Sequence, residues 1–177
     1  LKFSSNVGYT TGEMKALKKI MLSTGVNIGV ELYIKHDLFF NTSAGFSLLR
    51  FDYSDTANNS VFNSKYFLNI PLSIKKYYTV SKKSWVFWDF GIFANYHFID
   101  KKEIRNISGN NIKKQNDLGF NFGMLGSFGF KTIFSNNLSV DIGLSSQTDY
   151  ISSYKNESDK IKTDKRMLVI SLYRKLK

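Results

Sequence analysis

The chain has 177 residues, which suits a single domain spanning residues 1–177. It has no Cys and only two His, which argues against a disulfide framework, a thiolate metal site and a His-rich metal site. The formal net charge is +11, and a basic balance of this kind usually points to nucleic acid or to an anionic surface.

Apolar and polar residues alternate with a period of two along most of the chain, which is typical of β-strands with one apolar face. Between Val26 and Ile34, for example, Val, Ile, Val, Leu and Ile alternate with Asn, Gly, Glu and Tyr. The pattern predicts eight strands, at residues 1–11, 23–35, 38–53, 64–77, 84–99, 116–134, 138–151 and 164–176.

The lengths of these strands and of their connections indicate a membrane barrel. Many strands reach or exceed the ~9–11 residues that cross a bilayer at a tilt, whereas no segment approaches the ~20 apolar residues of a membrane-spanning helix. Short connections at 36–37, 78–83 and 135–137 alternate with longer polar ones at 12–22, 54–63, 100–115 and 152–163. We therefore predict an all-β fold, an eight-stranded antiparallel transmembrane β-barrel with up-and-down meander topology, as in outer-membrane proteins.

The polar face of the strands is rich in Gly, Ser and Asn, whereas a water-facing strand surface would carry Lys, Glu and Thr. Small residues belong where space is short, and the interior of an eight-stranded barrel is just wide enough for side chains. The polar face is therefore expected to point inward, and the Phe, Leu, Ile and Val face to meet lipid. Gly119, Gly123 and Gly129 would then make room for inward-pointing neighbours, whereas Gly126 falls on the apolar face and has no such explanation.

Six charged residues also fall on the predicted inner face: Glu31, Asp89, Asp141, Lys75, Lys131 and Lys2. Buried charges need partners, so we expect a salt-bridged, plugged interior without an open pore. A catalytic carboxylate pair is the alternative interpretation, but structural ion pairs are far commoner in such interiors.

The ends of the strands carry aromatic and basic residues. One predicted aromatic band lies at the long-loop end and the other at the short-turn end, as expected at two membrane interfaces. The bands are Tyr9, Tyr53, Tyr66, Tyr96, Phe98 and Tyr150, and Tyr33, Tyr77, Tyr78, Trp85, Phe134 and Tyr173. A basic rim at the short-turn end comprises Lys35, Lys76, Lys82, Lys83, Arg174 and Lys175. It could attract anionic lipid phosphates or dock a periplasmic partner, and charge alone does not separate these two roles.

The segment "YFLNIPLSIKKYY" at 66–78 resembles a recurrent segment of small barrels in the Bacteroidota outer membrane, the PorT-like family. "DLGFNFGMLGSFGF" and "LSVDIGLSS" resemble the closing strands of the same family. The resemblance implies an outer-membrane location and, for some members, an accessory role in type IX secretion and gliding. "DTA" at Asp55–Ala57 looks like the short O-glycosylation pattern of that phylum, which would make Thr56 the acceptor. Pro71 cannot donate to a sheet ladder, so a local break is expected there.

No catalytic motif is recognisable, and we expect no cofactor and no metal. His97 is followed by Phe98 and Ile99, so it lacks the His-x-Ser arrangement of one class of lipid A deacylase. Both His are expected to be rim or turn residues. No glycine-rich phosphate loop and no nucleic-acid-binding module occurs, so nucleic acid is not an expected partner.

These features favour a non-enzymatic structural or accessory subunit of an outer-membrane complex, with both termini in the periplasm. Expected partners are outer-membrane lipids, lipopolysaccharide included, and other outer-membrane or periplasmic proteins. A wall with few bulky residues around Thr42, Ala44 and Gly126 would suit a protein contact. The alternatives are a stand-alone barrel whose loops bind ligands or serve adhesion, and a lipid-modifying enzyme with an unrecognised site. Because the chain does not begin with Met, we expect that a targeting segment has been removed.

Overall fold

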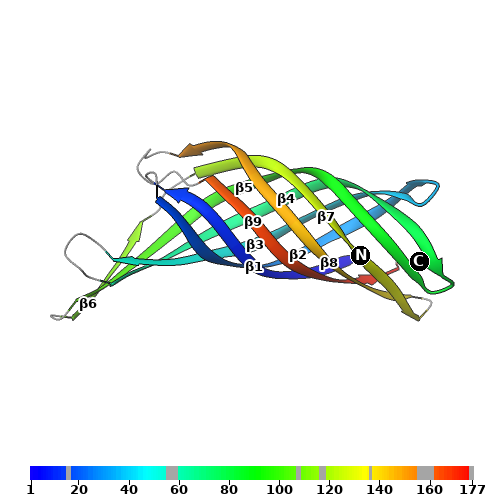
Figure 1. The fold of residues 1–177 in the computed structure, drawn as a ribbon, viewed down its shortest axis with the longest axis horizontal. Coiled ribbons are helices and arrows are strands. Elements are labelled where there is room, and N and C mark those ends of the chain that lie inside the picture. The colour runs from blue at the N-terminus through cyan, green and yellow to red at the C-terminus, as the bar shows by residue number, and fades with distance from the viewer. Residues whose placement is uncertain are drawn as a thin grey trace.

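The computed structural model describes residues 1–14, 17–54, 60–106, 109–115, 119–135, 137–154 and 162–175. These residues form β-strands (Figure 1). The strands are β1 (Lys2–Met14), β2 (Leu17–Lys35), β3 (Leu38–Ser54), β4 (Ser60–Ser81), β5 (Ser84–Asn106), β6 (Gly109–Gln115), β7 (Gly119–Ser135), β8 (Leu138–Tyr154) and β9 (Lys162–Arg174). No helix in this part of the chain is long and apolar enough to span a membrane.

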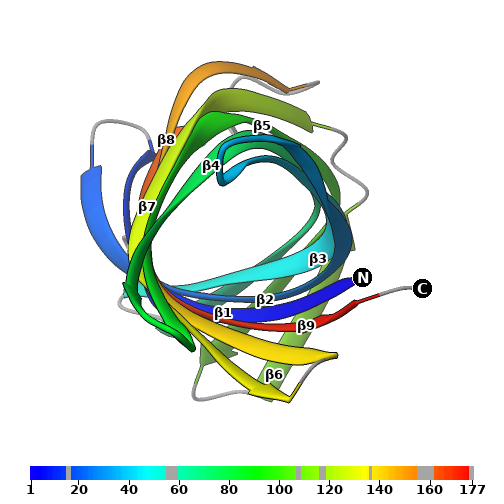
Figure 2. The same ribbon diagram turned by 90° about the vertical axis from the view of Figure 1, so that its right-hand side faces the viewer.

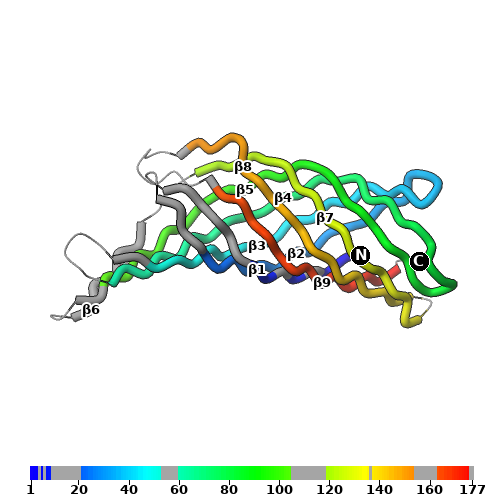
Figure 3. The backbone as a smooth tube through the Cα atoms, in the orientation of Figure 1, coloured from blue at the N-terminus to red at the C-terminus, as the bar shows by residue number. Residues whose placement is uncertain are grey.

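Antiparallel pairing closes eight of the strands into a ring, as Figure 2 shows from the end where both termini lie. From β1 to β5 and from β7 to β9 each strand pairs with the next along the chain. β5 pairs with β7, β1 pairs with β9 to complete the ring, and β6 pairs with β5 outside it. The strands run obliquely to the long axis (Figure 3), as closure of a barrel requires. The prediction of an eight-stranded antiparallel barrel is confirmed.

The prediction of long loops at 12–22 and 100–115 is wrong, because strands continue through most of both segments. β1 and β2 remain paired out to Met14 and Leu17, and Asp100–Asn106 pairs with β6 as a hairpin that projects beyond the ring (Figure 1). β5 has 23 residues, which at ~3.3 Å per residue far exceeds what a ~25 Å apolar band needs even at a tilt. Beyond the lipid both faces of a strand are wet, so the alternation that reveals strands in sequence disappears.

The predicted turn at 36–37 is confirmed as a two-residue hairpin connection. His36 and Asp37 have φ angles of 44° and 61°, and positive φ at both central residues is typical of a type I′ turn. Neighbouring groups brace the turn: the Tyr77 amide donates to the Asp37 carbonyl at 3.0 Å, and the His36 amide donates to the Tyr33 hydroxyl at 3.1 Å.

Burial follows the alternation and confirms which face points inward. Phe128 and Phe130 are 61% and 63% exposed on the outside, whereas Asn95 and Asn121 are 1% exposed on the inside. The small outward residues do not form one wall, however. Thr42 and Ala44 lie on β3, and β4 and β5 separate that strand from Gly126 on β7, so the expected contact wall is wrong.

Inward glycines lie opposite inward aromatic rings, as expected from the narrow interior. A Cβ added at Gly123 would lie 2.8 Å from Cζ of Phe93, and one added at Gly143 would lie 3.0 Å from Cζ of Phe87. Both rings are buried. At Gly126, by contrast, the nearest atom is the Asp89 carbonyl oxygen at 3.9 Å, so this position is open.

Pro71 interrupts one ladder, which confirms the expected local break. Pairing of β3 with β4 runs to Thr42–Leu72 and resumes at Gly45–Asn69 in the same register, so the break is a gap and not a bulge. The Thr42 hydroxyl donates to the Pro71 carbonyl at 3.2 Å across this gap.

Replacing Gly123 by Ala should lower the free energy of unfolding by about 1–3 kcal/mol, because the methyl group would clash with the Thr148 carbonyl oxygen and overpack against the Phe93 ring. Gly126→Ala on the same strand is the matched control, since its methyl group would meet open space. Urea unfolding of the refolded barrel in lipid vesicles, followed by tryptophan fluorescence, measures both. Equal stability of the two variants would contradict the proposed role of Gly123.

Candidate functional site

Charged side chains from four strands meet inside the barrel near the short turns. This group, the turn-side ionic layer, consists of Glu31 on β2, Lys75 on β4, Lys131 on β7 and Asp141 on β8. The Lys131 ammonium lies 3.0 Å and the Lys75 ammonium 3.7 Å from the Glu31 carboxylate, and Lys75 also forms an ion pair with Asp141. Four of the six charged residues predicted to lie inside thus form one chain of alternating charge.

Two tyrosine hydroxyls complete this layer. The Tyr77 hydroxyl donates to Glu31 at 2.7 Å and accepts from Lys131 at 3.0 Å, and the Tyr173 hydroxyl accepts from Lys75 at 3.0 Å. Both rings are buried, so their assignment to the aromatic band is wrong. They occupy inward positions of their strands, whereas Tyr33, Tyr78 and Phe134 are more than half exposed at the same end.

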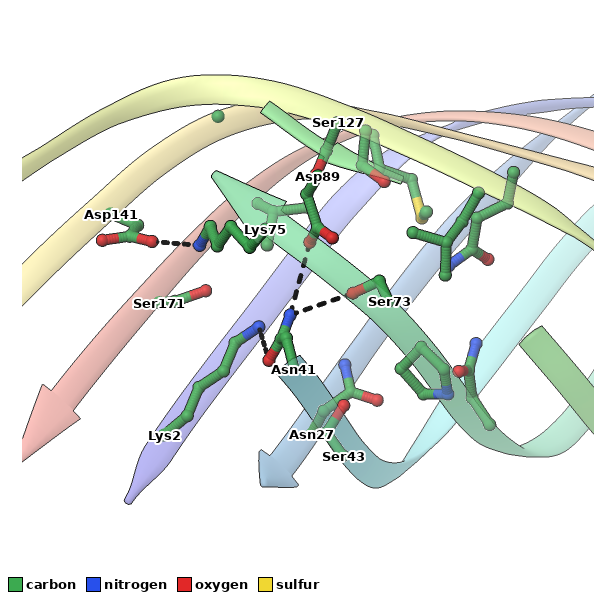
Figure 4. A pocket seen from close by; sticks show the side chains of 18 of the residues that line it. Lys2, Asn27, Asn41, Ser43, Ser73, Lys75, Asp89, Ser127, Asp141 and Ser171 are labelled. Atoms are coloured by element: carbon green, nitrogen blue, oxygen red, sulfur yellow. Dashed lines mark hydrogen bonds and ion pairs between the residues drawn. The ribbon is translucent and has the colours of Figure 1, made fainter. Parts of the chain in front are cut away.

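Asp89, the fifth predicted residue, lies apart from this layer and is linked to the sixth, Lys2, through an amide (Figure 4). The Lys2 ammonium donates to Asn41 Oδ1 at 3.2 Å, and Asn41 Nδ2 donates to Asp89 at 3.3 Å. Asn41 therefore bridges the Lys2 ammonium and the Asp89 carboxylate by hydrogen bonds.

A second set of buried charges lies nearer to the long loops, and we call it the loop-side ionic layer. It consists of Lys65, Asp100, Asp149 and Lys165. The Lys65 ammonium lies 2.7 Å from Asp100. Asp149 accepts hydrogen bonds from Asn121 at 2.8 Å and from the Thr163 hydroxyl at 2.7 Å. The Lys165 ammonium lies 5.3 Å from the centre of the Phe67 ring.

The sequence interpretation missed this second layer, although a signal was present. Lys65 shares the inward register of Phe67 and Asn69, and Lys165 shares that of Met167 and Ser171. Both residues lie next to the ends of the predicted strands, where the inward register was not followed further.

A polar cavity of about 80 Å³ lies between the two layers (Figure 4). The oxygen acceptors Ser47 Oγ, Asn69 Oδ1 and Gln147 Oε1 line it and have no hydrogen-bond partner among the described residues. A cavity of this size and polarity accommodates a few water molecules, which satisfy such acceptors. The described interior is thus a cross-linked core with a polar cavity that has room for a few water molecules.

The buried charges balance within the described interior. The acids are Glu31, Asp89, Asp100, Asp141 and Asp149, and the bases are Lys2, Lys65, Lys75, Lys131 and Lys165. Because these cancel, the net charge of +11 is carried outside this core. The basicity of the chain is therefore available to partners at the two ends of the barrel.

Neither histidine forms a recognisable reactive site. His97 is fully buried, its Nε2 lies 2.9 Å from the Ile99 carbonyl oxygen, and its ring packs 5.0 Å from Phe67, so its assignment to the rim is wrong. His36 lies in a turn, as predicted. Among the residues that the structure describes, no group of three His, Asp or Glu side chains is placed to hold a metal ion.

The basic rim lies at the turn end of the barrel. Lys35, Lys82, Lys83, Arg174 and Lys175 are exposed there. Lys76 differs, because its ammonium donates to the His36 carbonyl and lies 5.9 Å from the centre of the Tyr78 ring. Thr56 lies outside the described residues.

Comparison with solved structures identifies the architecture. Neisserial surface protein A matches with a TM-score of 0.53 and 9% identity, over 97% of this chain and 96% of that one. The outer membrane protein OprG from Pseudomonas aeruginosa matches with a TM-score of 0.54 and 11% identity, over 99% of this chain and 96% of that one. The fold is that of an outer-membrane β-barrel. At these identities the likeness concerns the fold alone, and no protein-family model and no curated protein sequence matches the chain.

Lys75→Met should destabilise the barrel by about 3–5 kcal/mol, because it leaves buried Asp141 without its cation. The double variant Lys75→Met with Asp141→Asn should recover part of this loss, since it removes the unpaired charge. Lys82→Met at the exposed rim is the control and should change stability by less than about 0.5 kcal/mol. Urea unfolding in lipid vesicles measures all three, and an unchanged Lys75→Met variant would contradict the structural role of the ion pair.

Proposed function

We propose that this chain is a non-enzymatic barrel of the bacterial outer membrane that serves as a structural or accessory subunit of an outer-membrane complex. Its termini and short turns face the periplasm in this proposal. The resemblance to PorT-like barrels of the Bacteroidota makes type IX secretion the first pathway to test.

The contrast between a neutral interior and a cationic rim carries this proposal. The interior charges neutralise one another and are held by fixed hydrogen bonds, so they offer little to a substrate. The rim, by contrast, presents exposed cations from several connections: the turns at Lys35 and at Lys82–Lys83, and the end of β9 at Arg174–Lys175. Such a ring of charge attracts an acidic surface from the aqueous side of the membrane.

A protein partner fits this rim better than lipid phosphate alone at two of these positions. Lys82 and Lys83 form the connection between β4 and β5, beyond exposed Tyr78 and Val80. Because aromatic residues mark the membrane interface, residues beyond Tyr78 reach past it toward the periplasm.

A second candidate function, surface-ligand binding, rests on the hairpin of β5 and β6. Lys101 lies directly opposite Lys114, and Lys102 directly opposite Lys113. The two strands of the hairpin thus carry four lysines at two neighbouring pairs of positions, and such a density of basic residues attracts an anionic ligand. The hairpin projects at the end opposite the termini (Figure 1), where a surface polysaccharide would be met.

Reversing charge at the rim with Lys82→Glu and Lys83→Glu should release the partner complex without unfolding the barrel. Gentle detergent extraction, size-exclusion chromatography and mass spectrometry of the peak measure this. Lys101→Glu with Lys102→Glu makes the same charge change at the other end and is the matched control. A wild-type chain that migrates alone in its micelle would overturn the subunit proposal.

Replacing Lys113 and Lys114 by Gln should reduce salt-dependent retention of the protein on immobilised heparin, a polysulfated saccharide. Lys18→Gln with Lys19→Gln is the matched control, because these adjacent lysines lie on the β1–β2 hairpin opposite Glu13 and Gly12. Equal losses in the two pairs would indicate general basicity and would contradict a hairpin-specific site.

A further inference from the structure

The outer wall of the barrel is hollowed at Gly126. A hollow of about 810 Å³ extends over the outer faces of β5, β7, β8 and β9 and reaches β1. Trp88, Phe90, Phe128, Leu144 and Leu168 supply its apolar lining. The volume is within the range of ~300–1,000 Å³ that is usual for small-molecule sites.

The missing side chain at Gly126 helps to create this hollow. Gly126 pairs with Phe90 on one side and with Ser146 on the other, so two small residues lie side by side between larger ones. Phe90 and Phe128 are 53% and 61% exposed beside them. The glycine that the alternation does not explain thus lies in the floor of an outward-facing apolar site.

One end of the hollow is polar. Arg166 lies opposite Ser146 in the ladder and lines the hollow. Its Nη1 donates to Ser146 and forms an ion pair with Asp164. The hydrogen bonds and the ion pair of Arg166 with other described residues all involve Nη1, and its side chain is 46% exposed, so the edge formed by Nε–H and Nη2 is available to a ligand. That edge matches two oxygens of a phosphate group.

Arg166 is also placed near a membrane interface. Leu168, Ile170 and Leu172 face outward between Arg166 and Arg174, and all three are more than 40% exposed. The eight residue-to-residue steps from Arg174 to Arg166 rise ~20 Å along the axis at the usual strand rise and tilt, close to the height of a ~25 Å apolar band. Arg166 therefore lies near the interface on the long-loop side, with its apolar hollow extending into the hydrocarbon.

We propose that the hollow binds one acyl chain of lipid A and that Arg166 binds a phosphate of the same molecule. This inference rests on the outer-membrane orientation in the proposed function, because that orientation places the long-loop side in the outer leaflet. Lipid A is the source that combines acyl chains with phosphate in that leaflet. An apolar hollow beside a guanidinium edge complements both parts of the molecule.

Native mass spectrometry of the refolded protein in detergent micelles, titrated with purified lipid A, tests the proposal. Gly126→Phe fills the hollow, and Arg166→Gln removes the guanidinium. Ala44→Phe is the matched control, since Ala44 is also small and outward-facing but lies on β3. Gel mobility before and after heating shows that each variant is folded.

We expect one lipid A to remain bound to the wild type and to Ala44→Phe, and affinity to fall about tenfold in Gly126→Phe. Arg166→Gln should bind lipid A and its dephosphorylated form equally, whereas the wild type should prefer the phosphorylated form. Equal binding by all four proteins, or a wild type that binds phosphatidylglycerol as well as lipid A, would overturn the proposal. If Gly126→Phe does not fold, the loss of phosphate preference in Arg166→Gln remains decisive.

The hollow could instead receive a side chain from a partner protein. A protein lost from native extracts of Gly126→Phe, together with unchanged lipid A binding, would show that occupant and would also overturn the proposal. The titration uses purified protein in defined micelles, so its result does not depend on a partner bound at the basic rim. Failure of the lipid A proposal can therefore be distinguished from failure of the proposed subunit function.

Discussion

Backbone hydrogen bonding in a medium without water is the constraint on which this structure depends. A sheet edge exposed to hydrocarbon leaves a row of unpaired amide and carbonyl groups, and each costs several kcal/mol. The pairing of β1 with β9 along Lys2–Glu13 removes that edge. Even the gap at Pro71 is partly closed, because the Thr42 hydroxyl donates to the Pro71 carbonyl.

Closure with only eight strands fixes what the interior can contain. Large inward rings such as Phe87 and Phe93 fit because Gly143 and Gly123 lie beside them. Many of the other inward positions hold Ser or Asn, and some hold charges that cannot be left unpaired at low dielectric. The ion pairs described inside the barrel join different strands. Lys131, for example, contacts Glu31, 100 residues away, so the network that neutralises these charges also cross-links the wall.

The sequence predicted the barrel because alternation survives wherever one face meets lipid and the other does not. It failed where that contrast ends. The segment 100–115 is mostly polar, so its sequence predicts a loop, whereas the structure forms the β5–β6 hairpin there. Lys65 and Lys165 lie next to the ends of the predicted strands, where the inward register is harder to follow. Tyr77 and Tyr173 lie near the ends of their strands, which predicts a place in the aromatic band. Their strand register points them inward instead, where Tyr77 contacts Glu31 and Tyr173 contacts Lys75. Contacts between strands far apart in sequence, such as Asp149 with Asn121, depend on register that alternation does not specify.

The lipid-facing positions of the barrel are mostly bulky and apolar, so each small or polar residue among them needs a separate explanation. Thr42 has one within the fold, since its hydroxyl bonds to Pro71. Ser146 and Arg166 have one in part, since Arg166 donates to Ser146 and pairs with Asp164, but Gly126, which precedes them in the same row across β7, β8 and β9, has none. The glycine, the serine and the arginine in this row line one hollow, which is apolar over most of its extent and polar at the end where Arg166 lies. The lipid A site proposed above depends on this row, because the glycine leaves room for an acyl chain and the arginine supplies donors for a phosphate.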